Sequence, residues 1–220
     1  MRPRRGEPAD GRVPEDDGQA AVRPGDGGAP LRSRGDAATV RPRDEAALAR
    51  DICLRQLAVR PRTRAELESA LTRRGISAEV AAQVLDRYGE VGIVDDAAFA
   101  RAWVTSRHHG RGLARRALAT ELRQRGIDPE TVAEALDALD ESTEAETARA
   151  LVDRKLRTVT GTPDAVFRRL VGMLARKGYP AGVAIRAVKE ALAERGAEAA
   201  EFADQIDVDA FVEAEAGPDR

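Results

Sequence analysis

The sequence predicts an all-α protein built from three tandem three-helix repeats of the helix-turn-helix kind, arranged as an elongated, curved array. Three observations support this prediction. Hydrophobic residues make up 42% of the chain but aromatic residues only 3%, so a core would consist mainly of Ala, Leu and Val, and the abundance of Ala, Leu, Glu and Arg favours helices. A leucine motif recurs three times at nearly constant spacing. Capping sequences flank the expected helices.

The internal repeat is centred on three glycines, Gly75, Gly126 and Gly178, which are 51 and 52 residues apart. Each glycine ends the pattern Leu-x-x-x-Leu-x-x-Arg/Lys-Gly. Sequence similarity at such a period is typical of stacked repeats, in which each unit buries its apolar face against its neighbours. The predicted repeats are residues 44–94, 95–141 and 142–196.

Each repeat contains signals for three helices. In the first repeat, an apolar helix stops near Pro61. The second helix begins at a capping box formed by Thr63 and Glu66, in which the hydroxyl and the carboxylate each accept a hydrogen bond from an unpaired backbone N–H. It ends at Gly75, the expected left-handed residue. Val80 begins the apolar face of the third helix.

The other two repeats contain similar signals for helix starts. Asp128 and Thr162 each precede a proline, which predicts an N-cap followed by proline at the first helical position. Thr143 and Glu146 have the spacing of another capping box and are expected to open the third repeat.

The two ends of the chain differ from the body. Residues 1–43 contain six of the eleven prolines and seven of the nineteen glycines, so we expect a disordered head. Residues 197–220 contain eight acids and only Arg220 as a cation. We expect a solvated acidic tail, and docking of this tail on the basic body is the alternative. The start lacks an apolar signal segment and no apolar run approaches membrane-spanning length, which favours a cytoplasmic protein without membrane contact.

Few residues are suited to catalysis or metal binding. The single cysteine, Cys53, lies on an apolar helix face and is expected to be packed. The two histidines lack a neighbouring nucleophile or carboxylate partner, and no phosphate-binding or metal-binding motif is present. Asp95 and Asp96 are interpreted as helix caps rather than metal ligands. We therefore expect a protein that is not an enzyme and needs no cofactor or metal.

Basic residues are the candidate binding residues. Two cations stand in the last turn of each middle helix, where they complement the helix dipole or form a basic stripe along the array. The segment from Ala98 to Gly126 has a net charge of +6 from seven arginines and one glutamate, and residues 108–112 are expected to form a loop within it. Phe99 and Trp103 have core spacing, so we expect no stacking platform for bases. The candidate partner- or phosphate-binding residues are Arg73, Arg74, Arg107, Arg111, Arg115, Arg116, Arg123, Arg125, Arg176 and Lys177.

Three segments resemble the RecX family, which regulates the RecA recombinase. The resemblance covers about residues 46–195, and nothing carries over to the head or the tail. The matching segments are Leu57-x-x-Arg60-x-Arg62-Thr63-x-x-Glu66-Leu67-x-x-x-Leu71-x-x-Arg74-Gly75, Asp95-Asp96-x-x-Phe99-Ala100-x-x-Trp103-Val104-x-x-Arg107 and Leu118-x-x-x-Leu122-x-x-Arg125-Gly126-Ile127.

The resemblance implies a specific partner and activity. Members of this family bind in the groove of the RecA–single-stranded-DNA filament and restrain RecA ATP hydrolysis, strand exchange and coprotease activity in recombination and the SOS response. The resemblance transfers no catalytic residues. It implies a monomer whose partners are the RecA filament and the single-stranded DNA within it, with weak direct DNA binding.

A direct DNA-binding regulator of the helix-turn-helix type is the alternative function. The net charge of +6 between Ala98 and Gly126 motivates it. Recognition helices usually present Asn, Gln, Ser or Arg to base edges. The expected third helix of the second repeat, residues 129–140, is instead acidic and rich in alanine, which argues against this alternative.

Overall fold

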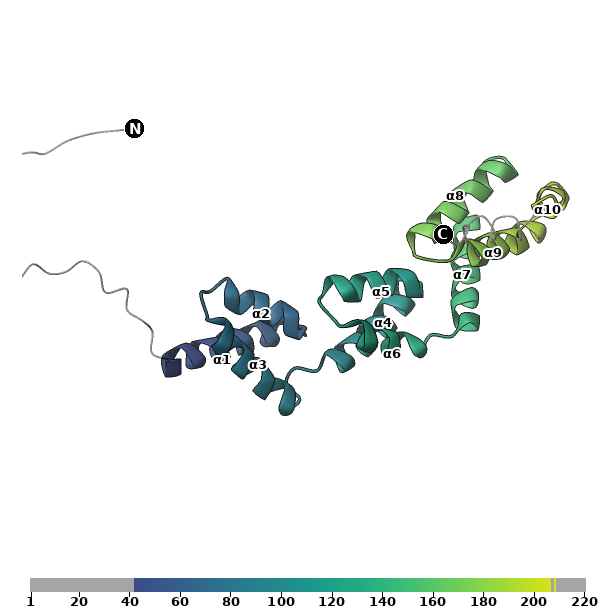
Figure 1. Ribbon diagram of the computed structural model, residues 1–220. Helices are drawn as coiled ribbons and strands as arrows, with labels where there is room; N and C mark the ends of the chain where they lie inside the picture. The colour runs from purple at the N-terminus through teal and green to yellow at the C-terminus, as the bar shows by residue number, and fades with distance from the viewer. Residues whose placement is uncertain (1–41, 207, 209–220) are drawn as a thin grey trace, which may run out of the picture. The chain divides into compact units, whose positions relative to one another are not determined.

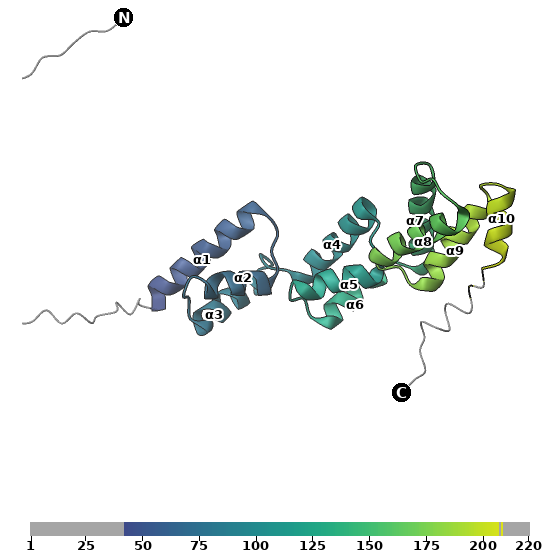
Figure 2. The ribbon, with the colours of Figure 1, turned by 90° about the horizontal axis from the view of Figure 1, so that it is seen from above.

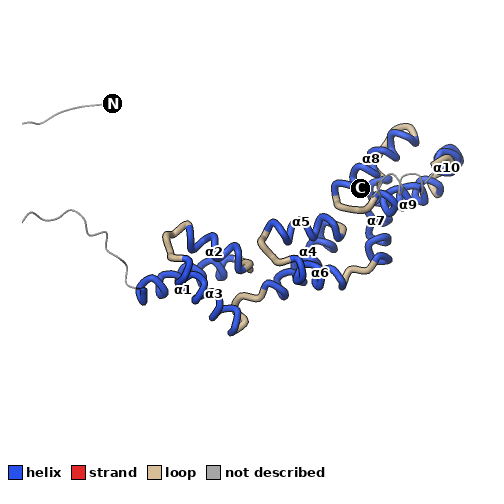
Figure 3. The backbone as a smooth tube through the Cα atoms, in the orientation of Figure 1, coloured by secondary structure: helices blue, strands red, loops and turns tan. Residues whose placement is uncertain are grey.

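The computed structural model describes residues 42–206 and 208, and within them the chain consists of helices joined by short loops (Figure 3). Ten α-helices, α1 to α10, follow one another without a strand in this part of the chain. The prediction of an all-α protein with three tandem three-helix units is confirmed. The expected disordered head falls outside the described residues except for residues 42 and 43, which begin α1.

The first three helices pack into the first bundle, in which each helix contacts the other two (Figure 1). The N-cap Thr63 accepts a hydrogen bond from the Glu66 N–H at 3.2 Å, and Gly75 adopts a left-handed φ of 77°. Both observations agree with the predicted start and end of the middle helix. Cys53 is buried, as expected, and burial raises its pKa. The helices are α1 (Pro42–Val59), α2 (Arg64–Thr72) and α3 (Ala78–Glu90).

The second bundle has the same three-helix plan around a core that includes Leu118, Leu122 and Leu136. Its third helix begins as predicted, because the Asp128 carboxylate accepts a hydrogen bond from the Thr131 N–H at 2.9 Å and Pro129 follows the cap. The helices are α4 (Asp96–Arg111), α5 (Arg115–Gln124) and α6 (Pro129–Asp137).

Two sequence expectations for the first helices of the second and third bundles were wrong. The expected loop over residues 108–112 belongs mostly to α4, which continues to Arg111 and ends at the left-handed Gly112. The third bundle is opened by Asp140, whose carboxylate accepts a hydrogen bond from the Thr143 N–H at 2.7 Å. Thr143 therefore lies inside the first turn rather than at the N-cap, because an ionised carboxylate upstream supplies the stronger cap.

The third bundle carries an additional helix. α10 packs against α8 and α9 (Figure 2), with Phe202 edge-on to Phe167 at a centroid distance of 5.9 Å and Ala203 fully buried. The expectation of a solvated tail was therefore wrong for residues 197–206, where Ala199, Phe202, Ala203 and Ile206 extend the core, whereas residues 207 and 209–220 lie outside the described part. The helices are α7 (Glu141–Leu156), α8 (Pro163–Arg176), α9 (Ala181–Ala193) and α10 (Ala197–Asp204).

Candidate functional site

The middle helices of successive bundles meet end to end. The Thr63 hydroxyl at the start of α2 donates a hydrogen bond to the carbonyl of Arg125 at the end of α5, at 2.7 Å. Likewise, the Ala114 N–H at the start of α5 donates to the carbonyl of Lys177 at the end of α8, at 2.9 Å. Carbonyls at a helix C-terminus lack partners within their own helix. We name the α2–α5 contact the first joint and the α5–α8 contact the second joint. Each joint supplies a hydrogen-bond donor to a carbonyl at a helix end where the sequence predicts a basic pair.

An acid from the following bundle completes each joint. Asp96 of α4 accepts a hydrogen bond from the Arg64 N–H in the first turn of α2, at 2.9 Å. Glu144 of α7, which is 5% exposed, accepts one from the Arg115 N–H in the first turn of α5, at 2.7 Å. Carboxylates are favourable at helix N-termini. Asp95 caps its own helix as predicted, whereas sequence reasoning missed the contacts of Asp96 and Glu144 across the joints.

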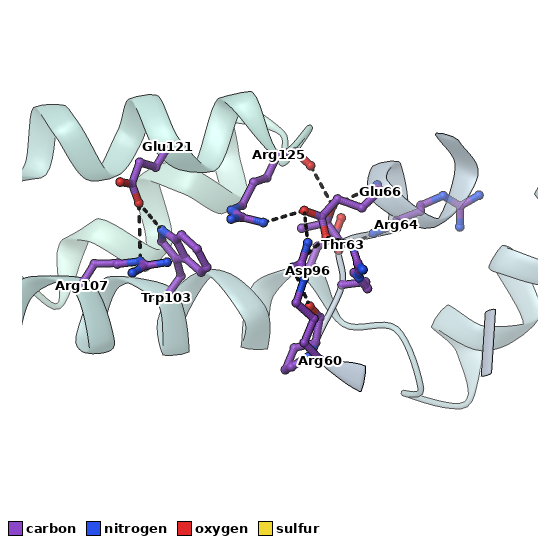
Figure 4. A network of polar contacts seen from close by, with 11 residues as sticks. Arg60, Thr63, Arg64, Glu66, Asp96, Trp103, Arg107, Glu121 and Arg125 are labelled. Atoms are coloured by element: carbon purple, nitrogen blue, oxygen red, sulfur yellow. Dashed lines mark hydrogen bonds and ion pairs between the residues drawn. The ribbon is translucent and has the colours of Figure 1, made fainter. Parts of the chain in front are cut away.

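The aromatic side chain of Trp103 lies beside the polar contacts of the first joint (Figure 4). The guanidinium carbons of Arg107 and Arg125 lie 4.0 Å and 3.9 Å from the Trp103 ring centroid. The indole Nε1–H donates to Glu121 at 2.8 Å, and the ring stacks on Phe99. Trp103 packs against the second bundle's core, as expected, but it is only partly buried. Its polar edge and its cation–π contacts place it at the rim of this core.

Arg125 connects this aromatic pair to the first bundle. Its Nη1 donates to Glu66 Oε1 at 2.5 Å, and the two side chains are 24% and 19% exposed. Glu66 was expected to close the capping box on Thr63. Its carboxylate instead contacts Arg125 and, at 3.4 Å, Arg60. Only the hydroxyl half of the predicted box is formed, because these two cations and Arg62, at 3.9 Å, hold the carboxylate.

Two concave surfaces are lined in part by α5, and Glu121 lines both of them. We name the first the arginine–tryptophan cleft, with a volume of about 450 Å³, and the second the α5–α8 groove, with a volume of about 550 Å³. The cleft is lined by Arg60, Glu66, Trp103, Arg107, Arg111, Glu121, Gln124 and Arg125. The groove is lined by Arg116, Ala117, Thr120, Glu121, Val171, Ala175, Arg176, Gly178, Tyr179, Ala181 and Ala184.

Among the ten candidate cations, internal partners hold the charged groups of Arg107, Arg115, Arg125 and Lys177. Arg107 and Arg125 lie over Trp103. Arg115 donates to the Leu139 carbonyl at 2.6 Å. The Lys177 ammonium donates to the Arg111 carbonyl, and burial lowers its pKa, to which the cations of Arg154 and Arg111 also contribute.

The remaining six candidates are exposed. Arg116 and Arg176 come together at the α5–α8 groove from two different bundles, and Arg111 lines the arginine–tryptophan cleft. These exposed side chains are therefore the cations best placed to meet a partner. Those that make no ion pair within the described part of the chain are Arg73, Arg74, Arg111, Arg123 and Arg176.

His108 has a structural position at the second joint. It is 2% exposed, and its ring nitrogens hydrogen-bond to the Leu113 carbonyl and to the Thr147 hydroxyl of α7, both at 2.9 Å. Among the described residues, no cluster of three or more His, Cys, Asp or Glu is arranged to hold a metal ion. No helix in that part of the chain is both long and apolar enough to cross a bilayer.

The Asp96 carboxyl should make stability depend on pH. Burial raises its pKa above the ordinary value of 3.8, although the hydrogen bond from the Arg64 N–H acts in the opposite direction. The folded state therefore binds the Asp96 proton more tightly than the unfolded state does. The stability gained from this proton is complete below pH 3.8 and is lost as the pH rises through the raised pKa.

Asp96→Asn keeps the oxygen acceptor and removes the titration. We expect the unfolding free energy of this variant, relative to wild type, to increase as the pH rises above 3.8 and then to level off. Urea unfolding of both proteins over a series of pH values measures this difference. A difference that does not change with pH would contradict the assignment.

Comparisons with known proteins identify the family. Models of the three successive RecX three-helix domains match residues 49–87, 95–136 and 142–188. The chain is 62% identical to the regulatory protein RecX of Thermobifida fusca over 68% of this chain and 82% of the relative. It is 54% identical to the regulatory protein RecX of Streptomyces coelicolor over 71% of this chain and 84% of the relative.

A solved structure shares the fold. The crystal structure of RecX from Lactobacillus salivarius superposes with a TM-score of 0.62 at 17% identity, covering 68% of this chain and 97% of that one. The three matched domains coincide with the three bundles, and the high-identity relatives are matched over most of their length. The chain is therefore a member of the RecX family of regulatory proteins.

Proposed function

We propose that this protein inhibits the RecA recombinase by binding the RecA–single-stranded-DNA filament, restraining its ATPase, strand-exchange and coprotease activities in recombination and SOS repair. It acts as a cytoplasmic monomer without a catalytic site of its own. Membership in the RecX family carries the proposal. The exposed arginines support it, because a filament containing DNA presents phosphates to which such side chains are attracted.

Direct sequence-specific DNA binding is less well supported by the bundles. The third helix of the second bundle, α6, exposes Glu130, Glu134 and Asp137. A recognition helix in the major groove lies between phosphate backbones, where these carboxylates would be repelled. We therefore treat the exposed arginines as contacts to the filament rather than as readers of base edges.

The experiment is RecA ATP hydrolysis on single-stranded DNA during titration of the full chain at moderate salt, with binding to bare DNA measured in parallel. We expect inhibition at fewer than one protein per RecA together with weak binding to bare DNA. Absence of inhibition combined with tight, salt-sensitive DNA binding would overturn the proposal in favour of the DNA-binding alternative.

A charge-reversal variant tests the exposed cations. We expect Arg73→Glu, Arg74→Glu, Arg123→Glu and Arg176→Glu together to abolish inhibition with unchanged helicity, because all four side chains are exposed. Arg115 and Arg125 are left intact, since their side chains have partners within the protein. Full inhibition by this variant would contradict the basic-contact hypothesis.

The matched control applies the same change in charge elsewhere. It reverses four exposed cations that lie away from the ends of the middle helices and outside the α5–α8 groove. We expect it to retain inhibition, and a loss equal to that of the test variant would show that net charge alone decides binding. The control substitutions are Arg43→Glu, Arg50→Glu, Lys155→Glu and Arg157→Glu.

A further inference from the structure

We propose that the C-terminal segment of this chain, residues 207–220, docks in the α5–α8 groove and competes there with the partner. The groove has an apolar floor that includes Val171, Ala175 and Ala184, and a rim that carries Arg116 and Arg176. The occupant should therefore combine large apolar side chains with carboxylates, because the floor favours burial of apolar surface and the rim favours negative charge.

The C-terminal segment has this combination of residues. Phe211 and Val212 follow Val208 by three and four residues, the spacing that places side chains on one helix face. The acids around them give the segment a negative charge opposite to that of the rim. They are Asp207, Asp209, Glu213, Glu215 and Asp219.

The end of α10 places this segment within reach of the groove. Phe202 lies against Phe167 of α8, one turn before the groove residue Val171. Ile206 and Val208 pack against the core of the third bundle. The apolar side chains that follow α10 thus already pack on the third bundle, which supplies one wall of the groove.

A second contact shows that the segment after Ile206 is long enough to reach the α5–α8 groove. The Lys189 ammonium of α9 donates to the Ile206 carbonyl at 3.0 Å. Lys189 lies about 8 Å along the helix axis from the groove residue Ala184, given a rise of about 1.5 Å per residue. The five residues from Ile206 to Phe211 span about 8 Å if they continue the helical conformation of Val208, and up to about 17 Å if extended. Phe211 can therefore reach the groove floor.

Docking of the C-terminal segment would weaken the inhibition of RecA by this protein. A short tether gives the segment a high effective concentration at the groove, so a partner has to displace it to reach Arg116 and Arg176. This regulatory consequence rests on the proposed RecA-directed function, whereas the docking itself does not.

Photocross-linking of the full chain tests the docking without RecA. With Phe211→p-benzoylphenylalanine, we expect cross-links within one chain to the peptides that contain residues 116–121 and 171–184. Adding Arg116→Glu and Arg176→Glu should remove these cross-links, whereas the control pair Lys155→Glu and Arg157→Glu should leave them unchanged. Cross-links only between two copies, only to other surfaces, or none at all would overturn the proposal.

Truncation tests the competition. A chain that ends at Val208 should inhibit RecA ATP hydrolysis at lower concentrations than the full chain, because the groove is no longer occupied. Unchanged inhibition would overturn the competition. If neither chain inhibits RecA, the proposed function fails, while the cross-linking result still decides whether the segment docks.

Discussion

Replacing Gly178 by alanine should destabilise the protein by about 2–4 kcal/mol, the sum of an unfavourable backbone conformation and overpacking. Gly178 has a φ of 89°, a region that L-residues other than glycine adopt at a cost. An added Cβ would lie 2.5 Å from the Ala117 backbone nitrogen and 2.7 Å from its Cβ. The first turn of α5 would therefore have to move away from the end of α8, which would disrupt the second joint.

Gly75→Ala is the matched control. Gly75 has a similar φ of 77°, but nothing lies within 4 Å of an added Cβ, so we expect only the backbone cost of about 1 kcal/mol. Urea unfolding and the midpoint of thermal unfolding measure both variants. Equal losses of stability would show that the contact between α5 and α8 adds nothing to the cost at Gly178.

Arg125→Ala should have the second largest effect, a loss of about 2 kcal/mol in unfolding free energy. The substitution removes the ion pair with Glu66, whose side chain is only 19% exposed. It also removes the guanidinium from the faces of Trp103 and Phe99. Glu66 would then keep only the longer contacts with Arg60 and Arg62.

Arg74→Ala is the control for Arg125→Ala, since Arg74 occupies the equivalent position in the first bundle and is exposed. We expect this change to alter stability by less than about 0.5 kcal/mol. Combining Arg125→Ala with Glu66→Ala should cost less than the sum of the single losses, because the two side chains interact directly. Additive losses would contradict a direct interaction across the first joint.

Local signals in the sequence predicted the helices well. Thr63, Asp128 and Thr162 cap their helices as expected, each accepting a hydrogen bond from an N–H three residues later. Such a cap involves only neighbouring residues, so the sequence contains all the information it needs. The same holds for Gly75, because a left-handed residue at a helix end is a local feature.

Contacts between bundles could not be predicted in this way. Asp96 and Glu144 have the local appearance of acids in a first turn, yet each caps a helix of the preceding bundle. Trp103 has core spacing, but its environment depends on Arg125, which comes from α5, and on Glu121. The internal partners of Arg107, Arg115 and Lys177 could not be predicted for the same reason, because these partners lie elsewhere in the chain.

The joints also determine where the peptide dipoles of the middle helices remain uncompensated. The negative end of α5 meets the positive end of α2, and the negative end of α8 meets the positive end of α5, so the partial charges offset each other at both joints. Two ends remain: the C-terminal end of α2, where Arg73 and Arg74 supply opposite charge, and the N-terminal end of α8, where Asp164 does so. A cation at an internal joint is therefore not needed to neutralise a helix end, which leaves the Arg125 side chain available to join two bundles.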